Sequence, residues 1–376
     1  MSYRIEVIDN LDGAIAIEDS WRMLAEEVAE DPFTSPDWLI PWWQAFGQVS
    51  RMHLLIAWDG SRLVGFAPLR IVDGSGRHAS YKVLRHWSNS HSNRISWLLT
   101  RDDREDLASA LVAEALSDDS WDLAVLGPMM REDSVTTSVY RSFDRRVTTG
   151  WRDGLESPVL SLPDTWDVLL ASLTPTFVKR LNQQGRRASR NGAQVSFSDD
   201  AQQMEDVFAI SRRSWQHQQG TAVASSSDTR LFYEGVATRM ARRGRLELGF
   251  LSIGEELAAF ELKVLWRGWT YNLKREFVQA HRSHSPGSVL KAAALKRAID
   301  RGDVACDFLG ASEPHKLNWT EVVRPHGAIV VARRGTWLRL RHWVEFGAAG
   351  WFRRSMPWAK PLVRRVRRCW KRVVVA

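Results

Sequence analysis

The sequence has little cysteine and no apolar stretch long enough to cross a membrane. Only Cys306 and Cys369 occur among its 376 residues, too few for the disulfide framework of small secreted proteins. No apolar run approaches the ~18 residues of a membrane-spanning helix, and the first residues lack the apolar core of a signal peptide. With 26% charged residues, 24 Gly and 13 Pro, the composition also excludes disordered, collagen-like and coiled-coil chains. These absences predict a soluble, cytoplasmic protein of about two domains.

Acidic residues are nearly missing from the C-terminal segment. Residues 333–376 hold 13 Lys and Arg against one acid, Glu345, whereas the rest of the chain has 39 basic and 43 acidic side chains. Because the chain outside this segment has no excess of positive charge, we expect no nucleic-acid partner. Five of the 19 Trp lie among the arginines of this segment, a mixture typical of an anionic membrane surface. We therefore predict a basic helical tail, either peripheral on the inner face of the membrane or packed against the body.

Two regions of the body share one order of predicted elements. Each region has two apolar strands around a tight turn, then a third strand, a helix and a short strand. These are predicted at 54–69, 81–87, 104–116 and 121–127, and again at 246–265, 269–277, 285–301 and 304–310. A repeat of this size predicts an α/β (α+β) fold of two tandem domains, each with a mixed central sheet flanked by helices. We place the domains at 1–158 and 159–332, followed by the tail at 333–376.

The most informative segment is the start of the helix predicted at 285–301. Ser285 is a suitable N-cap, Pro286 suits the first helical position, and Gly287 leaves the backbone bare. Free N–H groups and the positive end of the helix dipole favour an anion such as a pyrophosphate. A second basic feature is the helix predicted around 177–190, which carries five cations. That helix is either a solvated face or a dock for an acidic carrier or a phosphorylated donor.

Three antiparallel strands, a Gly-containing loop that opens a helix, and a parallel strand form the core order of the GCN5-related N-acetyltransferases (GNAT). Within that superfamily the chain resembles the CelD-type group, which is related to the FemABX aminoacyl transferases. The matching residues are Ser285-Pro286-Gly287-x-x-Leu290 and Asp307-Phe308-Leu309-x-x-x-Glu313-Pro314-x-Lys316-x-x-Trp319. The sequence departs from the group at His315, where an aromatic Tyr is usual.

The resemblance implies two tandem GNAT-like domains and acyl transfer from acyl-CoA or an acyl-carrier protein to an amine of a small molecule, peptide or sugar. It implies no tightly bound cofactor, because the acyl-phosphopantetheine is a co-substrate. The alternatives are an O-acyltransferase of exopolysaccharide synthesis and a non-catalytic, membrane-associated scaffold with a transferase fold. The donor-binding residues so implied are Ser283, His284, Ser285, Pro286, Gly287, Ser288, Val289, Leu290 and Lys316.

The acceptor amine must lose a proton, which requires a nearby base. Glu261 is the first candidate because partial burial in an apolar strand would raise its pKa. Tyr271 is a candidate acid for the leaving thiolate. Glu276, Asp307 and Glu313 are further, weaker candidates, each equally suited to a structural role such as a helix cap or an ion pair with Lys316. We expect no metal site, since His281 and His284 lack a third ligand. The first repeat has Ala67 where the second has Glu261, so we expect the N-terminal domain to be a scaffold or a wall of the acceptor groove.

Overall fold

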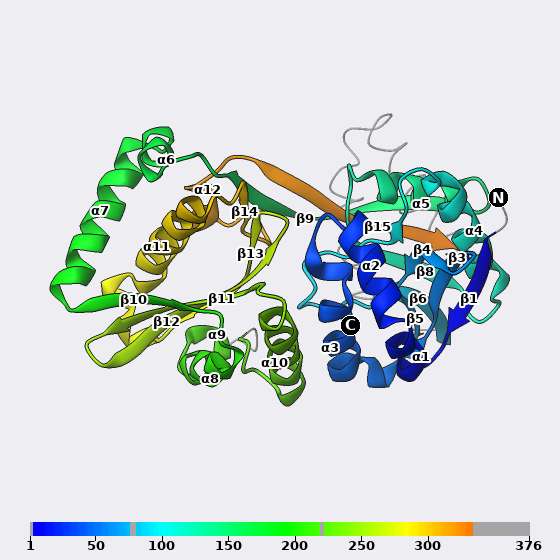
Figure 1. Ribbon diagram of the computed structural model, residues 1–376, viewed down its shortest axis with the longest axis horizontal. Coiled ribbons are helices and arrows are strands. Elements are labelled where there is room, and N and C mark those ends of the chain that lie inside the picture. Colours follow the sequence, from blue (N-terminus) through cyan, green and yellow to red (C-terminus); the bar gives the residue numbers. More distant parts are fainter. Residues whose placement is uncertain (1–2, 76–79, 219–221, 334–376) are drawn as a thin grey trace, which may run out of the picture.

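The computed structural model describes residues 3–75, 80–218 and 222–333. Its strands form an eleven-stranded sheet in the order β10-β11-β12-β13-β14-β9-β15-β8-β6-β5-β2 and a four-stranded sheet in the order β1-β3-β4-β7. The large sheet runs through both halves of the molecule, with helices on its two faces (Figure 1). The predicted tail lies outside the described residues, except for Arg333.

The first half alternates short helices with the strands of both sheets. Its elements are β1 (Arg4–Ile8), α1 (Leu11–Ala16), α2 (Glu18–Val28), η1 (Pro32–Thr34), α3 (Pro36–Phe46), η2 (Gly47–Val49), β2 (Arg51–Met52), β3 (Leu54–Asp59), β4 (Arg62–Ala67), β5 (Leu69–Ser75), β6 (Ser80–His86), β7 (Leu98–Leu99), α4 (Arg104–Ser117), β8 (Leu123–Met130) and α5 (Ser134–Asp144).

The second half has longer strands and two 16-residue helices. Its elements are β9 (Thr149–Ser161), α6 (Trp166–Ser172), α7 (Pro175–Arg190), β10 (Ala193–Ser198), η3 (Ala201–Gln203), α8 (Met204–Arg212), α9 (Trp215–Gln218), α10 (Ser227–Ala241), β11 (Leu246–Ile253), β12 (Glu256–Trp266), β13 (Trp269–Phe277), η4 (Gln279–His284), α11 (Pro286–Arg301), β14 (Ala305–Asp307), α12 (Pro314–Leu317) and β15 (Val323–Ala332).

The predicted repeat is visible in how the strands pair. In the first unit β5 pairs antiparallel with β6, α4 follows, and β8 returns parallel to β6. In the second unit β12 pairs antiparallel with β13, α11 follows, and β14 returns parallel to β13. The fold is therefore two tandem α/β units with mixed sheets flanked by helices, as the sequence predicts.

The first predicted hairpin differs from the expectation. Its two strands and its turn at Gly60, where φ is 57°, form as predicted. However, the second strand is interrupted at Pro68, which has no N–H to donate to a strand ladder. β4 ends at Ala67 and stays in the small sheet, whereas β5 begins at Leu69 and enters the large one.

Two strands join the units into one sheet. β9 pairs with β15 from Thr149 to Pro158 and then with β14 from Val159 to Ser161. β15 also pairs with β8 of the first unit. The division at 158/159 therefore falls inside β9 and stays a prediction about domains rather than a break in the sheet.

Aromatic side chains make up much of the interior. The largest core joins α2 and α3 of the first half to α8, α10 and the β11–β13 strands of the second. Seven Trp of the described part of the chain are fully buried, namely Trp21, Trp38, Trp42, Trp87, Trp97, Trp121 and Trp266. Among the described residues, no helix is both long and apolar enough to span a bilayer.

Candidate active site

α11 begins and ends where its sequence requires. Pro286 occupies the first turn, a buried stripe runs along the helix, and Gly302 ends it with a φ of 85°. Ser285 stands at the N-cap position, but its backbone is left-handed (φ 54°) and its side chain makes no capping hydrogen bond. The predicted side-chain cap is therefore wrong, because the η4 turn delivers the chain to the helix in a conformation that directs the hydroxyl elsewhere.

The start of α11 offers fewer free N–H groups for an anion than predicted. The Ser285 carbonyl accepts the N–H groups of Ser288 (3.0 Å) and Val289 (3.2 Å), and the Ser285 N–H donates to the carbonyl of Arg282 (3.1 Å). Within the described chain, the Gly287 N–H is left without a hydrogen bond in this turn. A Cβ built on Gly287 would meet only Phe277 and Arg275, at 3.7 Å or more. One N–H group without a hydrogen-bond partner, that of Gly287, therefore lies at the cavity described next.

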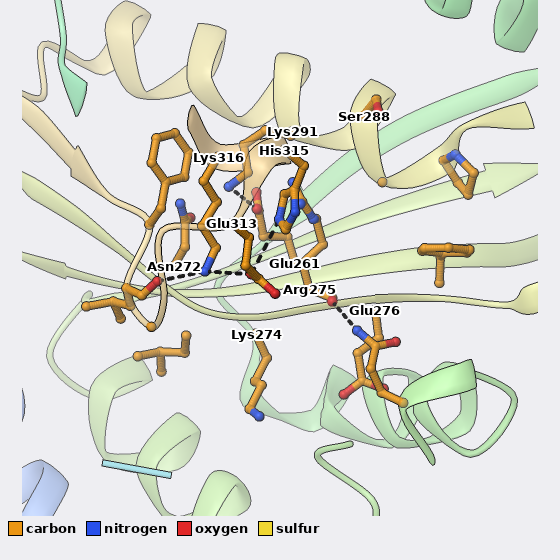
Figure 2. Close-up of a pocket in the computed structure, with 18 of the residues that line it drawn as sticks. Glu261, Asn272, Lys274, Arg275, Glu276, Ser288, Lys291, Glu313, His315 and Lys316 are labelled. Carbon is orange, nitrogen blue, oxygen red and sulfur yellow. Dashed lines mark hydrogen bonds and ion pairs between the residues drawn. The ribbon is translucent and has the colours of Figure 1, made fainter. Parts of the chain in front are cut away.

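The main cavity forms where β13 and β14 separate. β14 pairs with β13 only through Trp269–Tyr271 and ends at Asp307. Asp307 then accepts the Leu309 N–H (2.9 Å) and contacts Arg94 of the first half, which fixes a turn with Leu309 at φ 52°. Since the chain diverges here, the second half of β13 borders a cavity of about 730 Å³ (Figure 2).

A β-bulge distributes the β13 side chains over both faces of the sheet. Leu262 and Lys263 of β12 are adjacent but pair with Lys274 and Asn272, so Leu273 is the extra residue. Asn272 and Arg275 consequently share the face covered by α11, whereas Lys274 and Glu276 share the opposite face. In Figure 2, Ser288 and Lys291 lie on the α11 side of the strands and Lys274 on the other. The cavity, lined from both faces, passes through this opening in the sheet.

Glu261 lies on the α11 side as a fully buried ion-pair partner. Its carboxylate contacts the ammonium of Lys291, and Lys263 lies 4.0 Å away. Burial opposes the charge, but Lys291, Lys263 and Arg275 together lower the pKa of Glu261. The predicted rise of this pKa is therefore wrong, because three cations outweigh desolvation. Burial conversely lowers the pKa of Lys291 to about 8.

Glu276 is the carboxylate on the opposite side of the opening. It is 1% exposed and accepts hydrogen bonds from Ser211 (3.0 Å), Ser214 (2.7 Å) and the Val223 N–H (2.9 Å). Burial raises its pKa, although these donors and Lys274 oppose the rise. From the sequence, Glu276 was a weaker candidate that was equally suited to a structural role. A cluster of three charged residues, Lys274, Arg275 and Glu276, near the end of β13 is the signal that marks this part of the strand.

Lys316 and Glu313 lie on the third wall of the cavity. The Lys316 ammonium donates to the carbonyls of Leu309 (2.8 Å) and Ala311 (3.1 Å) and lies 3.0 Å from Glu313. The predicted Glu313–Lys316 ion pair is thus confirmed. His315 beside them also lines the cavity, and burial lowers its pKa to about 4. Lys316 therefore shapes the turn after β14 and adds positive charge to the cavity.

The first half also contributes to the cavity. Ser90, His91 and Asn93 line it together with Tyr233 of α10. The His91 ring stacks on Phe46, with centroids 5.8 Å apart, and burial lowers its pKa to about 4. The first half therefore supplies part of the cavity wall, and its role in an acceptor groove stays a prediction.

Seven of the predicted site residues line the cavity and five do not. Those at the cavity are Glu261, Ser285, Pro286, Gly287, Ser288, Glu313 and Lys316. Ser283, His284, Val289 and Leu290 lie outside its lining, and Leu290 is fully buried. Tyr271 also lies outside, because its hydroxyl donates to the carbonyl of Glu30 (3.1 Å) in the core between the units. This position removes the basis for Tyr271 as the acid. Across the described ranges, no group of three or more His, Cys, Asp or Glu is arranged to hold a metal ion.

Comparison with known proteins supports the fold. Residues 176–317 match the family model described as an acetyltransferase (GNAT) domain. The crystal structure of FemX is similar to this chain, with a TM-score of 0.61 and 11% identity. The similarity covers 90% of this chain and 100% of the FemX chain. L-PGS from Bacillus licheniformis is similar over 86% of this chain and 95% of its own, with a TM-score of 0.53 and 11% identity.

A third similar structure is the C-terminal domain of a putative lysylphosphatidylglycerol synthetase from Agrobacterium fabrum. It covers 87% of this chain and 94% of its own, with a TM-score of 0.53 and 11% identity. No curated protein matches the sequence. The chain thus has a GNAT/FemABX-like fold, and residues 176–317 of its second half match the model of a GNAT acetyltransferase domain.

Proposed function

We propose that this chain, whose second half carries a GNAT acetyltransferase domain, transfers an acyl group from a phosphopantetheine thioester to an amine inside the main cavity. The observation that carries the proposal is the opening between β13 and β14, which is lined from both faces of the sheet. Two reactants can therefore approach one point from opposite sides, and holding them in that geometry is itself a large part of catalysis.

The donor enters on the α11 side. That side offers the Gly287 N–H and the cations Arg275 and Lys291, and it places no unpaired acid in the first turn of α11. Phosphate oxygens are favoured at such a helix start. The same cations favour the negative charge that develops on the thioester oxygen during attack. In this account, Glu261 is a positioning residue that keeps Lys291 charged and in place.

The amine enters on the α10 side, where Glu276 is the best-placed base. A carboxylate whose pKa is raised by burial accepts a proton more readily than one held by three cations. The amine nitrogen attacks the carbonyl carbon, the C–N bond forms and the C–S bond breaks. The proton of the amine passes to Glu276, and the departing thiolate takes a proton from solvent.

The test is transfer by the purified full-length chain with acetyl-CoA and longer acyl-CoA donors against a panel of amino acids, amino sugars and peptides. Free thiol and N-acyl product are measured together, so that hydrolysis is distinguished from transfer. Glu276→Gln should lower kcat by roughly 10²–10⁴, the usual range for a lost general base.

The matched control is Glu256→Gln, since Glu256 lies on neighbouring β12 but pairs with Arg213 and His281 away from the cavity. It should retain wild-type rates. Wild-type rates in a folded Glu276→Gln variant would remove Glu276 from the chemistry. Absence of thioester turnover with every donor would favour the non-catalytic scaffold.

A further inference from the structure

The two sides of the main cavity differ in charge. The α11 side has the cations Arg275 and Lys291. Of the described residues that line the α10 side, only Lys274 and Glu276 carry a charge at pH 7. The other polar side chains of this side are neutral, and burial keeps His91 among them by lowering its pKa to about 4. They are Ser90, His91, Asn93, Gln216 and Tyr233. A ligand on the α10 side therefore meets one positive and one negative group.

Lys274 and Glu276 leave the same face of one strand. They lie two positions apart on β13, which separates their backbone positions by about 6.6 Å. Figure 2 shows both side chains on the side of the strands away from α11. The negative charge of Glu276 opposes the fall that burial causes in the pKa of Lys274, so the two charges are close enough to interact. One small ligand can therefore contact both.

The Glu276 carboxylate has room for one more hydrogen-bond donor. Its Oε1 accepts the Val223 N–H (2.9 Å), and its Oε2 accepts the hydroxyls of Ser214 (2.7 Å) and Ser211 (3.0 Å). A carboxylate can accept about four hydrogen bonds. One position on Oε1 therefore stays available to an N–H group of a ligand.

Gln216 provides a second acceptor at the same place. Its amide nitrogen donates to the carbonyl of Arg275 (3.1 Å), next to Glu276 along β13. Its Oε1 is buried and has no hydrogen-bond partner within the described chain. A buried acceptor of this kind calls for a donor. Gln216 and Glu276 together suit the N–H groups of an amine.

An α-amino acid matches this arrangement. Its amino group and its carboxylate are bonded to one carbon, so with a charged hydrogen bond of about 2.8 Å at each end it bridges two groups several ångströms apart. An amine without a carboxylate gains nothing from Lys274. An amine far from its carboxylate is too long for two side chains at neighbouring positions of one strand face. A phosphate, with about −1.5 to −2 charge, exceeds what one ammonium balances.

We propose that the amine acceptor is a free α-amino acid, whose carboxylate binds Lys274 and whose amino group is held by Glu276 and Gln216. This proposal rests on the proposed function and deepens it by naming the substrate class. The amino acid loses one ammonium proton to solvent, and the resulting amine attacks the thioester carbon. Its next proton passes to Glu276 as the C–N bond forms, the C–S bond breaks, and the thiolate takes a proton from solvent. The products are an N-acyl amino acid and a free thiol.

The first experiment measures binding alone. The common L-amino acids are titrated calorimetrically into the full-length chain, each beside its C-terminal amide, which keeps the amine and the side chain but lacks the negative charge. At least one amino acid should bind at least about tenfold more tightly than its amide, as expected for one charged hydrogen bond. Lys274→Gln should remove this preference, and Lys274→Arg, which keeps the charge, should retain it.

The matched control is Lys296→Gln, since Lys296 is exposed on α11 and does not line the cavity. It should keep the preference within about twofold. Equal loss in this control would mean unspecific attraction and would overturn the proposal, as would an unchanged preference in folded Lys274→Gln. The comparison of acid with amide in the wild type needs no variant, and the absence of any preference there would overturn the proposal by itself.

The second experiment separates this proposal from the proposed function. Amino acid, amide and a dipeptide with the same first residue are compared as acceptors with a donor that the wild type uses. The wild type should prefer the amino acid at least about tenfold in kcat/KM, although its amine is more basic and less often deprotonated than that of the amide. Lys274→Gln should raise KM for the amino acid and leave kcat and KM for the donor within about twofold.

The possible failures point to different conclusions. Equal or faster transfer to the amide, the dipeptide or an amino sugar would overturn the substrate class and leave the proposed function standing. Amino acid binding that depends on Lys274, without transfer from any thioester donor, would contradict the proposed function and leave the binding site standing.

Discussion

The two units of the repeat have the same strands and helix, but they differ where the parallel strand pair ends: this place borders a polar cavity in the second unit and is occupied by buried rings in the first. In the first unit, the chain that follows the parallel pairing of β6 with β8 continues into His86 and Trp87, which are both fully buried. The Trp97 indole donates to His86 (3.0 Å), and the Trp87 indole donates to the carbonyl of Leu69 (2.7 Å). In the second unit the same place is the Asn272–Phe277 edge of β13, which borders the cavity.

The helices that follow these strands also differ between the units, in the charge of their first turns. The first turn of α4 carries Glu105 and Asp106, whereas the first turn of α11 has Pro286, Gly287 and Ser288 and no acid. Carboxylates in a first turn stabilise the helix itself by interacting with its dipole, and they repel an external anion. The comparison shows that one topology can place buried indoles or a polar cavity at the same position, which supports the proposal that the second unit holds the active site.

Truncating the aromatic filling of the first unit should have the largest effect. Trp87 packs on Trp43 (centroids 4.5 Å apart) and is fully buried, so Trp87→Ala should lower the free energy of unfolding by about 3–5 kcal/mol. Urea denaturation measures the loss, with exposed Met23→Ala as control. Kinetics of the protein that remains folded should not change. A loss of donor affinity in that protein would contradict the division of roles between the units.

Glu261→Gln should destabilise the second unit by about 3 kcal/mol, because it leaves Lys291 buried without its counter-charge. The first unit has the fully buried Ala67 at the matching position and needs no such pair. Adding Lys291→Met to Glu261→Gln should restore most of the lost stability, since both charges are then absent. If the double variant is as unstable as the single one, the pairing is not what stabilises this region.

Changing Gly287 sharpens the contrast between the two helix starts. Gly287→Asp would give α11 a first-turn acid as in α4 and place it near Arg275, so donor affinity should fall about 10- to 100-fold. Gly287→Ala is the matched control, because its Cβ meets ordinary contact distances, and it should bind nearly as the wild type does. Calorimetric titration with CoA measures both. Equal affinity of all three proteins would exclude this turn from donor binding.

The smallest expected effect is a pH dependence of stability that comes from His91, which lies on the cavity wall supplied by the first half. The pKa of His91 is lowered to about 4 in the folded protein, so below about pH 6.5 the unfolded chain binds a proton that the folded chain does not. Stability is therefore lost as pH falls from about 6.5 to about 4. His91→Phe should lessen this loss, by about 1 kcal/mol or less at pH 6. Parallel pH profiles of wild type and variant would contradict the assignment.

Much of the fold follows from local sequence signals. The helix at Pro286–Arg301, the strand at Trp269–Phe277 and the repeated order of elements were all predicted, because periodicity and end signals are local. The pairing of β9 with β15, which joins the two units into one sheet, was not predicted. It brings together segments about 175 residues apart, and no local pattern encodes such a contact.

Several residues of the candidate site were predicted from the sequence, but the interactions that set their charge were not. Gly287, Glu261 and Lys316 were identified from motif and composition, and all three line the cavity. The environment of Glu261 was missed because Lys291 lies one helix away and reaches it only after folding. The position of Glu276 could not be predicted, because a bulge at Leu273, invisible in the sequence, decides which face of the sheet its side chain joins.

The most direct test of the account is a crystal structure of the full chain with an acyl-CoA analogue whose thioester sulfur is replaced by methylene. We predict phosphate density at the Gly287 N–H and the acyl carbonyl in the opening between β13 and β14, within reach of an amine held by Glu276. Density at the start of α4, or a donor that lies wholly on one face of the sheet away from the opening, would contradict the account.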